Sequence, residues 1–252
     1  MKHSGFKNMV YTFVAGFLVL VAVFAAWQIF SILHATSTAK KAYSELAAEA
    51  AGSEDFAQKD PLQRSLDWPS LQKSYPGIVG WLSDPEGSID YPIMQAEDND
   101  YYLTHLPGGT QNNHGSLFLD CNGSSDFADW NNLVYGHNMK DGTMLACLTE
   151  YAQQSYYDAH PALILYTPAG NYSLPVLSAY ETTAASNAYR QGGTADDHAA
   201  WLQEIGAKSA VSVQDCGEQT PLVLTLSTCI NGIDNSDKRF VVHLALLPAA
   251  RE

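Results

Sequence analysis

Basic residues are scarce in this chain, which holds 13 Lys and Arg against 27 Asp and Glu among its 252 residues. The formal net charge is −14. Proteins that bind nucleic acid meet its phosphate backbone with clustered basic side chains, and this balance offers no such electrostatic footprint. We therefore exclude nucleic acid as a partner.

Cysteine is also sparse. The four cysteines include no C-x-x-C pair and have no histidine at ligand spacing, so we expect no metal site. Four cysteines in a chain of this length also exclude a small disulfide scaffold, although Cys216 and Cys229 could close a loop outside the cell. For Cys121, Cys147 and Cys216 we favour a structural or simply buried role.

Low-complexity sequence is lacking too, since the 18 Gly and 11 Pro show no repeat. Hydrophobic residues make up 46% of the chain and aromatic residues 11%, which is enough for a packed core and excludes a disordered chain. At this length one large or two small domains are expected, and all-β barrels commonly reach about 200 residues as one unit. We expect a single main domain.

Only one long hydrophobic run is present, at residues 9–33, and it carries no charged side chain. As a helix rising about 1.5 Å per residue, this run covers the ~30 Å hydrocarbon core of a bilayer. The alternative is a signal peptide that is cleaved near residues 37–39. The length of the run disfavours it, because the apolar region of a signal peptide is only about 7–15 residues. We predict a transmembrane signal anchor, and Lys2 and Lys7 favour a cytoplasmic location for residues 1–8.

Residues 34–66 have the composition of a helical stalk and linker. Strong helix formers fill residues 39–51, and Gly52 ends this pattern. The sequence of residues 54–66 is mixed and polar, which fits a linker or a second short helix. The main domain is then expected at residues 67–252, outside the cell.

The main domain consists of short apolar runs separated by Gly, Pro, Asn and Asp. Eight such runs are typical of a β barrel or sandwich. They lie at residues 78–82, 89–94, 116–119, 132–135, 162–166, 172–177, 222–226 and 240–246. Two further stretches, residues 143–152 and 195–207, have helical character.

Cys229 differs from the other cysteines in its setting, because an apolar run at residues 221–228 gives way there to a polar loop. A thiol at the exit of a rigid strand is held in place yet accessible, as a nucleophile requires. Arg239 follows ten residues later, at the start of the next run. If the two strands pair, its guanidinium can favour the thiolate and donate hydrogen bonds to an oxyanion in acyl transfer.

A cysteine nucleophile also needs a base, and His137 is the strongest candidate among the eight histidines. It lies where the run at residues 132–135 gives way to a loop, directly after Gly136. The other histidines lack this setting and lie beside the hydrophobic run (His3, His34), within a strand (His243) or in loops and helical stretches (His105, His114, His160, His198). A lone histidine is more often a structural or surface residue, so spacing alone leaves that alternative open.

These residues together resemble a known family. The T-L-S-T-C run at residues 225–229, the Y-G-H run at 135–137 and Arg239 are similar to the signature of sortases, the cysteine transpeptidases of Gram-positive cell surfaces. The resemblance spans residues 68–247 and includes V-G-W-L at 79–82, I-D-Y-P-I at 89–93, D-N-D-Y-Y-L at 98–103 and G-S-L-F-L-D at 115–120. The ten-residue gap from Cys229 to Arg239 and the helical stretch before the last two strands look like class B.

The resemblance implies a mainly β (α+β) fold, an eight-stranded closed barrel with helical additions, preceded here by a transmembrane helix. It places Cys229, His137 and Arg239 in one groove. It also implies contacts between the groove and a bound sorting peptide at Asn99, Leu103, Tyr135, Ser227, Thr228 and Ile230. The residues alone leave other roles open, since Leu103 could be core, Asn99 a helix cap and Tyr135 a packing residue.

One departure from the pattern follows the cysteine. Some class B members carry acidic residues just after it, where this chain has Ile230 and Asn231. The chain therefore lacks an acidic groove contact, or an acidic third catalytic residue, at these positions.

The resemblance also implies a function, that of a membrane-anchored transpeptidase needing no cofactor. Such an enzyme cleaves the C-terminal sorting motif of secreted proteins through a thioester, here on Cys229, with Arg239 and the backbone N–H of Ile230 stabilising the oxyanion. The acyl group then passes to an amine of a peptidoglycan cross-bridge or of a pilin. The alternatives are a pilin-polymerising sortase, a cysteine peptidase that hydrolyses its substrate, and a catalytically idle module that binds sorting peptides.

Overall fold

The computed structural model describes residues 3–51, 60–85, 87, 89–217, 221–230 and 237–249. The chain divides into two compact units, residues 1–41 and residues 42–252. Asn231 lies outside the described residues.

Helix α1 (His3–Ala51) is long and apolar enough to cross a membrane. An 18-residue window within Val10–Ala50 has a mean hydropathy of 2.4, and none of that window is buried in the protein. The helix formers expected to build a stalk continue the same helix, which is described as far as Ala51. A helix whose exposed side chains are nearly all apolar is more stable in the hydrocarbon of a bilayer than in water.

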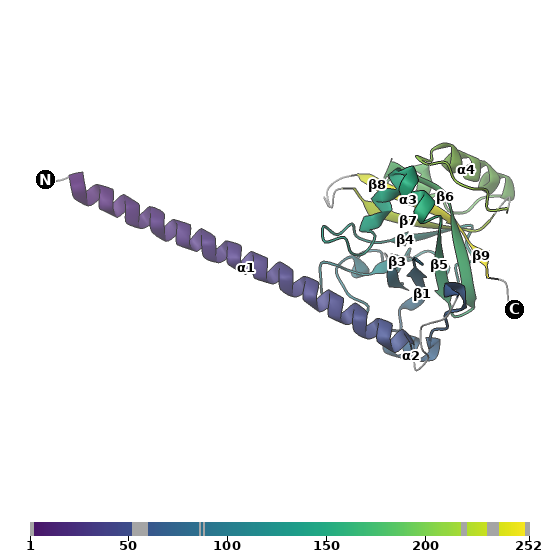
Figure 1. Cartoon of the computed structure of the whole chain (residues 1–252), viewed down its shortest axis with the longest axis horizontal. Coiled ribbons are helices and arrows are strands. Elements are labelled where there is room, and N and C mark those ends of the chain that lie inside the picture. The colour runs from purple at the N-terminus through teal and green to yellow at the C-terminus, as the bar shows by residue number, and fades with distance from the viewer. Residues whose placement is uncertain are drawn as a thin grey trace. The chain divides into compact units, whose positions relative to one another are not determined.

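Eight strands form the barrel, and each overlaps one of the eight apolar runs in the sequence. They are β1 (Ile78–Ser83), β2 (Asp90–Met94), β3 (Leu117–Leu119), β4 (Asn131–Tyr135), β5 (Ala162–Thr167), β6 (Gly170–Thr183), β7 (Val223–Cys229) and β8 (Lys238–Ala245). A two-residue strand, β9 (Leu247–Pro248), pairs with β6. The strand order is β5-β1-β2-β3-β4-β7-β8-β6, and pairing between β5 and β6 closes the sheet. The expected eight-stranded closed barrel is confirmed (Figure 1).

Two strand pairs within this barrel are parallel, β2 with β3 and β4 with β7, while the other pairs are antiparallel. Parallel neighbours need a crossover connection, because a tight turn joins only antiparallel strands. The connection from β4 to β7 carries the strands β5 and β6 and, within the described residues, half of the helical segments. It brings segments about 90 residues apart in the sequence to one edge of the barrel.

Short helices fill the connections. They are α2 (Trp68–Ser74), α3 (Gln154–Ala159) and α4 (Ala195–Ala207), with 3₁₀ turns η1 (Pro61–Gln63), η2 (Tyr101–Leu103), η3 (Ala146–Ala152) and η4 (Asn187–Tyr189). Helix α4 has the bounds that the sequence predicts, and a capping box between Thr194 and Asp197 starts it. The helical stretch expected at residues 143–152 is instead the 3₁₀ segment η3.

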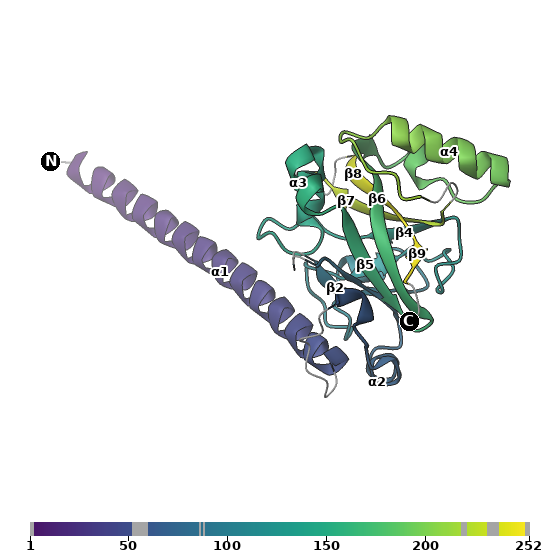
Figure 2. The same cartoon turned by 45° about the vertical axis from the view of Figure 1, so that its right-hand side comes forward.

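The alternation of side chains along β7 separates two clusters of buried residues. Leu224 and Leu226 belong to the large cluster that fills the barrel. Val223 points the other way and packs with Trp201 and Ile205 of α4. Figure 2 shows α4 beside the strands that it covers. Because side chains alternate along a strand, Ser227 and Cys229 share the outer face with Val223.

A third cluster joins the end of α1 to the barrel. Leu46 and Ala50 are buried together with Leu71 of α2 and with Trp81 and Met94 of the first two strands. Residues of the expected stalk thus form part of the core of the second unit. Burial of apolar surface contributes about 25 cal/mol per Å², so this contact stabilises the unit.

Candidate active site

The carboxyl ends of β4 and β7 bring two predicted site residues together. These adjacent parallel strands pair Tyr135 with Ser227. His137 and Cys229 each lie two residues beyond these partners, so both emerge at the same edge of the barrel. The candidate base and the candidate nucleophile are therefore neighbours, although 92 positions separate them in the sequence.

A backbone contact holds the imidazole of His137. Its Nε2 lies 2.7 Å from the carbonyl oxygen of Leu103, in η2. Because a carbonyl oxygen only accepts hydrogen bonds, Nε2 carries a proton and donates it to this bond. The other ring nitrogen, Nδ1, is thereby the one that can exchange a proton with a reacting group.

Three hydrogen bonds tie the loop after β4 to the end of β7. Gly136 N donates to Ser227 O at 3.1 Å, and Thr228 Oγ1 donates to Gly136 O at 2.8 Å. Asn138 Nδ2 donates to Cys229 O at 3.0 Å. The buried hydroxyl of Thr228, expected at the peptide groove, thus links the two strands.

Arg239 lies directly opposite Cys229 in the antiparallel pair of β7 and β8. Residues directly opposite each other in such a pair place their side chains on the same face of the sheet. The guanidinium donates from Nη1 to the carbonyl oxygen of Lys238 at 3.0 Å. A cation is thus held beside the thiol, where it can donate to an oxyanion.

The backbone N–H of Ile230 is engaged elsewhere. It donates to the carbonyl oxygen of Lys238 at 3.4 Å and so extends the ladder between β7 and β8. The sequence analysis expects this N–H to stabilise an oxyanion together with Arg239. In this structure the group points across to β8 and is already used in that hydrogen bond.

A buried carboxylate, not singled out in the sequence analysis, joins two of the expected groove residues. Asp120 Oδ2 accepts from Asn99 Nδ2 at 3.0 Å and from Tyr135 OH at 3.2 Å. Asp120 Oδ1 accepts from both the backbone and the side chain of Asn122. Asn99 is fixed further because its Oδ1 accepts from Cys121 N at 2.8 Å. Burial, with the nearby Asp120 charge, raises the pKa of Tyr135, so its phenol stays protonated as a donor.

The structure bears on the helix-cap alternative for Asn99 and on the core alternative for Leu103. Asp98, not Asn99, accepts from the first backbone N–H groups of the turn at η2. Leu103 packs against a buried cluster that also contacts Tyr135, so it is both packing residue and neighbour of His137. Asp120 could have been found in the sequence, since it directly follows the strand β3.

Tyr189 is a second residue that the sequence analysis missed. Its hydroxyl lies 2.8 Å from Ser227 Oγ, and its ring stacks on that of Tyr135 with centroids 6.3 Å apart. Burial raises the pKa of Tyr189, while the Arg239 charge opposes that rise. This tyrosine comes from η4 and reaches the site only through the tertiary fold.

None of the four cysteines, all of which the structure describes, is in a disulfide, so the loop considered between Cys216 and Cys229 is not closed in this structure. Burial raises the pKa of Cys147 to about 11, which keeps that thiol protonated and unreactive at neutral pH. Cys229 is the cysteine that ends a strand beside a histidine and an arginine.

His243 has a structural environment, unlike His137. Its ring is enclosed between Thr225 Oγ1, 2.8 Å from Nδ1, and Tyr180 OH, 3.1 Å from Nε2. Complete burial lowers the pKa of His243 to about 3, so the ring is neutral at any physiological pH. It cross-links three strands under α4 and has no access to a substrate.

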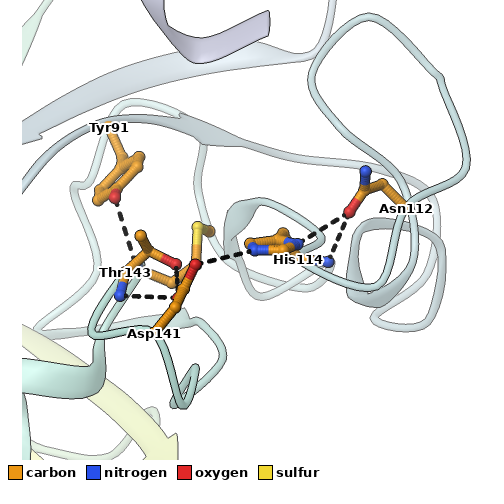
Figure 3. A network of polar contacts seen from close by, with 6 residues as sticks. Tyr91, Asn112, His114, Asp141 and Thr143 are labelled. Atoms are coloured by element: carbon orange, nitrogen blue, oxygen red, sulfur yellow. Dashed lines mark hydrogen bonds and ion pairs between the residues drawn. The ribbon is translucent and has the colours of Figure 1, made fainter. Parts of the chain in front are cut away.

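A polar network orders the loop that follows His137 (Figure 3). Asp141 Oδ1 accepts from the backbone and side chain of Thr143, and Oδ2 lies 3.5 Å from His114 Nε2. His114 is itself held by Asn112 Oδ1, 3.0 Å from Nδ1. Partial burial opposes ionisation, but these hydrogen bonds hold the pKa of Asp141 below its usual value. These contacts connect the loop after His137 to the segment that holds Asn112 and His114.

Comparison with known proteins identifies the family. Sortase B of Listeria monocytogenes is 34% identical over 174 residues, which cover 69% of this chain and 71% of that protein. The chain belongs to the class B sortases. Sortase B of Staphylococcus aureus is 33% identical over the same shares of the two chains. No model of a protein family matches the chain.

Solved structures of sortase B are similar to this chain in fold as well as in sequence. A complex of Staphylococcus aureus sortase B with substrate has a TM-score of 0.68 and 31% identity, covering 72% of this sortase and 85% of that chain. Sortase B of Bacillus anthracis, solved with AAEK1, has a TM-score of 0.74 and 28% identity, covering 86% of this sortase and all of that chain.

Membership of this family makes the chain an enzyme of the cysteine transpeptidase class. Within the described ranges, no three His, Cys, Asp or Glu side chains converge in a way that could hold a metal ion. The groups that this sortase offers for chemistry are a thiol, an imidazole and a guanidinium at one edge of the barrel.

Asp120→Asn is expected to destabilise the protein by about 1–3 kcal/mol, because the substitution leaves a buried donor without its acceptor. Urea denaturation followed by circular dichroism measures this loss. Asp126→Asn is the matched control, since that exposed carboxylate accepts from Ser124 near the surface and its loss should cost no more than about 0.5 kcal/mol. Equal stabilities for the two variants would show that Asp120 does not hold the groove together.

Proposed function

We propose that the protein is a membrane-anchored transpeptidase that cleaves a C-terminal sorting motif and joins the resulting acyl group to an amine of the cell wall. The observation that carries this proposal is the meeting of Cys229, His137 and Arg239 at the ends of three adjacent strands. The family supports it, because sortases are transpeptidases of the cell surface.

In the first half-reaction, Cys229 Sγ attacks the carbonyl carbon at the end of the sorting motif. The carbonyl oxygen becomes an oxyanion, and the Arg239 guanidinium stabilises it. His137 Nδ1 takes the proton that the Cys229 thiol gives up and donates it to the leaving amine as the C–N bond breaks. The products are a thioester on Cys229 and the released C-terminal peptide.

In the second half-reaction, an amine attacks the thioester carbon. His137 accepts the proton that the amine loses, while Arg239 again stabilises the oxyanion. The C–S bond breaks, a C–N bond forms, and Cys229 leaves with the electron pair of its sulfur. This acyl transfer needs no redox partner and no organic cofactor.

The sorting peptide is proposed to lie along the wall formed by residues that meet on one side of Cys229. That wall consists of Asn99, Leu103, Tyr135 and Ser227, with Thr228 and Ile230 at the end of β7. Asp120 and Tyr189 support it, because they hydrogen-bond to Tyr135 and Ser227 respectively. The motif is read by side chains that these contacts hold rigid.

Residues 9–33 are proposed to anchor the protein in the cell membrane as a single span. Residues 1–8 then lie in the cytoplasm, residues 34–66 form the stalk and linker, and the catalytic domain at residues 67–252 lies outside. The partners are secreted proteins with a C-terminal sorting motif and, as acceptor, a cross-bridge or pilin amine. The exposed apolar side chains of α1 support this topology.

Product partitioning tests the proposal. The enzyme is incubated with a sorting peptide and increasing amounts of an amine, and acid and amide products are measured by mass spectrometry. We expect a thioester on Cys229 and a shift from acid to amide as the amine increases. Thioester with acid alone at every amine concentration indicates a peptidase, and binding without a thioester indicates an idle module.

A further inference from the structure

A pocket of about 400 Å³ lies beside the reacting residues and has no part in the mechanism described so far. Its lining comes from Asn138, Lys140, Thr149, Ala152, Glu181, Ile230 and Phe240. Asn138 directly follows the candidate base, and Ile230 directly follows the candidate nucleophile. The volume is in the range that holds a small organic ligand.

Apart from Ile230, which the two share at the end of β7, this pocket lies on the other side of the strand from the proposed peptide wall. Ser227 and Cys229 share the outer face of the strand, where Ser227 meets Tyr189. Ile230, one residue on, packs against the cluster that fills the barrel, and so does Phe240 of β8. A molecule in the pocket therefore approaches Cys229 from the side that the sorting peptide leaves open.

The pocket carries one charge of each sign. Lys140 and Glu181 are exposed, and among the described residues neither has an ion-pair partner. The wall between them includes the apolar side chains of Ile230 and Phe240. A ligand that suits this lining has an ammonium, a carboxylate and an apolar stem.

The pairing of the strands sets the distance between Glu181 of the pocket and Cys229. Cys229 pairs with Arg239 of β8, and the neighbouring Phe240 pairs with Glu181 of β6. Two strand spacings of about 4.8 Å put Glu181 about 10 Å from Cys229 between Cα atoms. Glu181 thus lies too far away to contact an amine that attacks the thioester, and it is placed to bind a second group on the same molecule.

We propose that this pocket is the acceptor subsite and that it selects amines with a zwitterionic far end. Lys140 binds the carboxylate of the acceptor and Glu181 binds its non-reacting ammonium. A stem of about four methylene groups crosses Ile230 and Phe240 and brings the reacting amine to the Cys229 thioester. The inference rests on the proposed function, because an acceptor exists only if the enzyme transfers its acyl group.

Four amines of equal stem length test the two charges separately. Free lysine has both charged groups, cadaverine lacks the carboxylate, 6-aminohexanoate lacks the second ammonium, and pentylamine lacks both. The measured quantity is the ratio of amide to acid product at limiting amine, with cadaverine corrected for its two equivalent amines. Fragmentation of the lysine product assigns the new bond to the side-chain nitrogen.

We expect lysine to react best and pentylamine worst, with each charge contributing about a 1.4- to five-fold difference. That range corresponds to the 0.2–1 kcal/mol typical of exposed ion pairs. Lys140→Gln should remove the advantage of lysine over cadaverine and leave its advantage over 6-aminohexanoate. Glu181→Gln should do the reverse.

Two matched variants control for net charge. Lys73→Gln and Glu150→Gln change the same charges at exposed positions outside the pocket and should leave the order of the four amines unchanged. Equal reactivity of all four amines in the parent enzyme would overturn the inference, as would an order that survives in both pocket variants. The rate of thioester formation without amine reports on the proposed function independently, because its loss would contradict the transpeptidase mechanism itself.

Discussion

Cys229→Ala is expected to abolish cleavage of sorting peptides, with a fall in kcat of roughly 10⁶-fold, the scale seen when a serine hydrolase loses its nucleophile. The thiol is half-buried at the end of β7, and its removal takes away one sulfur without disturbing the strand pairing. Peptide cleavage and the intact mass of the protein are measured together. The parent enzyme should gain the mass of the acyl group, and the variant should not.

Cys216→Ala is the matched control for this experiment, since Cys216 is also half-buried and in no disulfide but lies away from β7. It should retain activity, apart from a packing loss of about 1–3 kcal/mol in stability. A folded Cys229→Ala variant that still cleaves near the parent rate would place the nucleophile elsewhere. A folded but inactive Cys216→Ala variant would point to a disulfide with Cys229 in the active protein.

Arg239→Lys should lower kcat by about 10²–10³-fold, although the substitution keeps the positive charge. An ammonium cannot reproduce the planar fork of guanidinium donors that reaches both the strand backbone and an oxyanion. Steady-state kinetics with a sorting peptide separates kcat from KM. An oxyanion donor acts in the transition state, so the effect should fall on kcat rather than KM.

Arg190→Lys provides the same substitution at an arginine that pairs with Asp197 near α4. That exposed pair contributes little to stability, so kcat should stay within about two-fold of the parent value. If Arg239→Lys changes KM alone, the guanidinium binds the peptide and does not stabilise the oxyanion.

The strands of the barrel follow from the sequence because each is a local pattern. Apolar runs bounded by turn residues predict all eight strands. The start of α4 is also specified by nearby residues, through the capping box at Thr194. The segment at residues 143–152 is less well predicted. Its composition indicates a helix, while the hydrogen-bonding type, here 3₁₀, depends on packing against the barrel.

The site is only partly readable from the sequence. Cys229, His137 and Arg239 stand out because each lies at the end of a strand. Their meeting depends on the register between β4 and β7, which no local pattern specifies. Tyr189 escapes notice for the same reason, since it acts through a hydrogen bond to Ser227, 38 residues later in the chain. The position of Asp120 after a strand is visible in the sequence, but its hydrogen bond to Tyr135 is not.

The parallel pairing of β4 with β7 also governs when the thiol becomes reactive. The hydrogen bond from Asn138 to Cys229 closes a loop of 91 residues, and contacts between such distant segments form late because loop closure must be overcome first. Before this contact forms, the chain holds no imidazole beside the Cys229 thiol. The candidate nucleophile and the candidate base therefore come together only when β4 and β7 pair in the completed barrel.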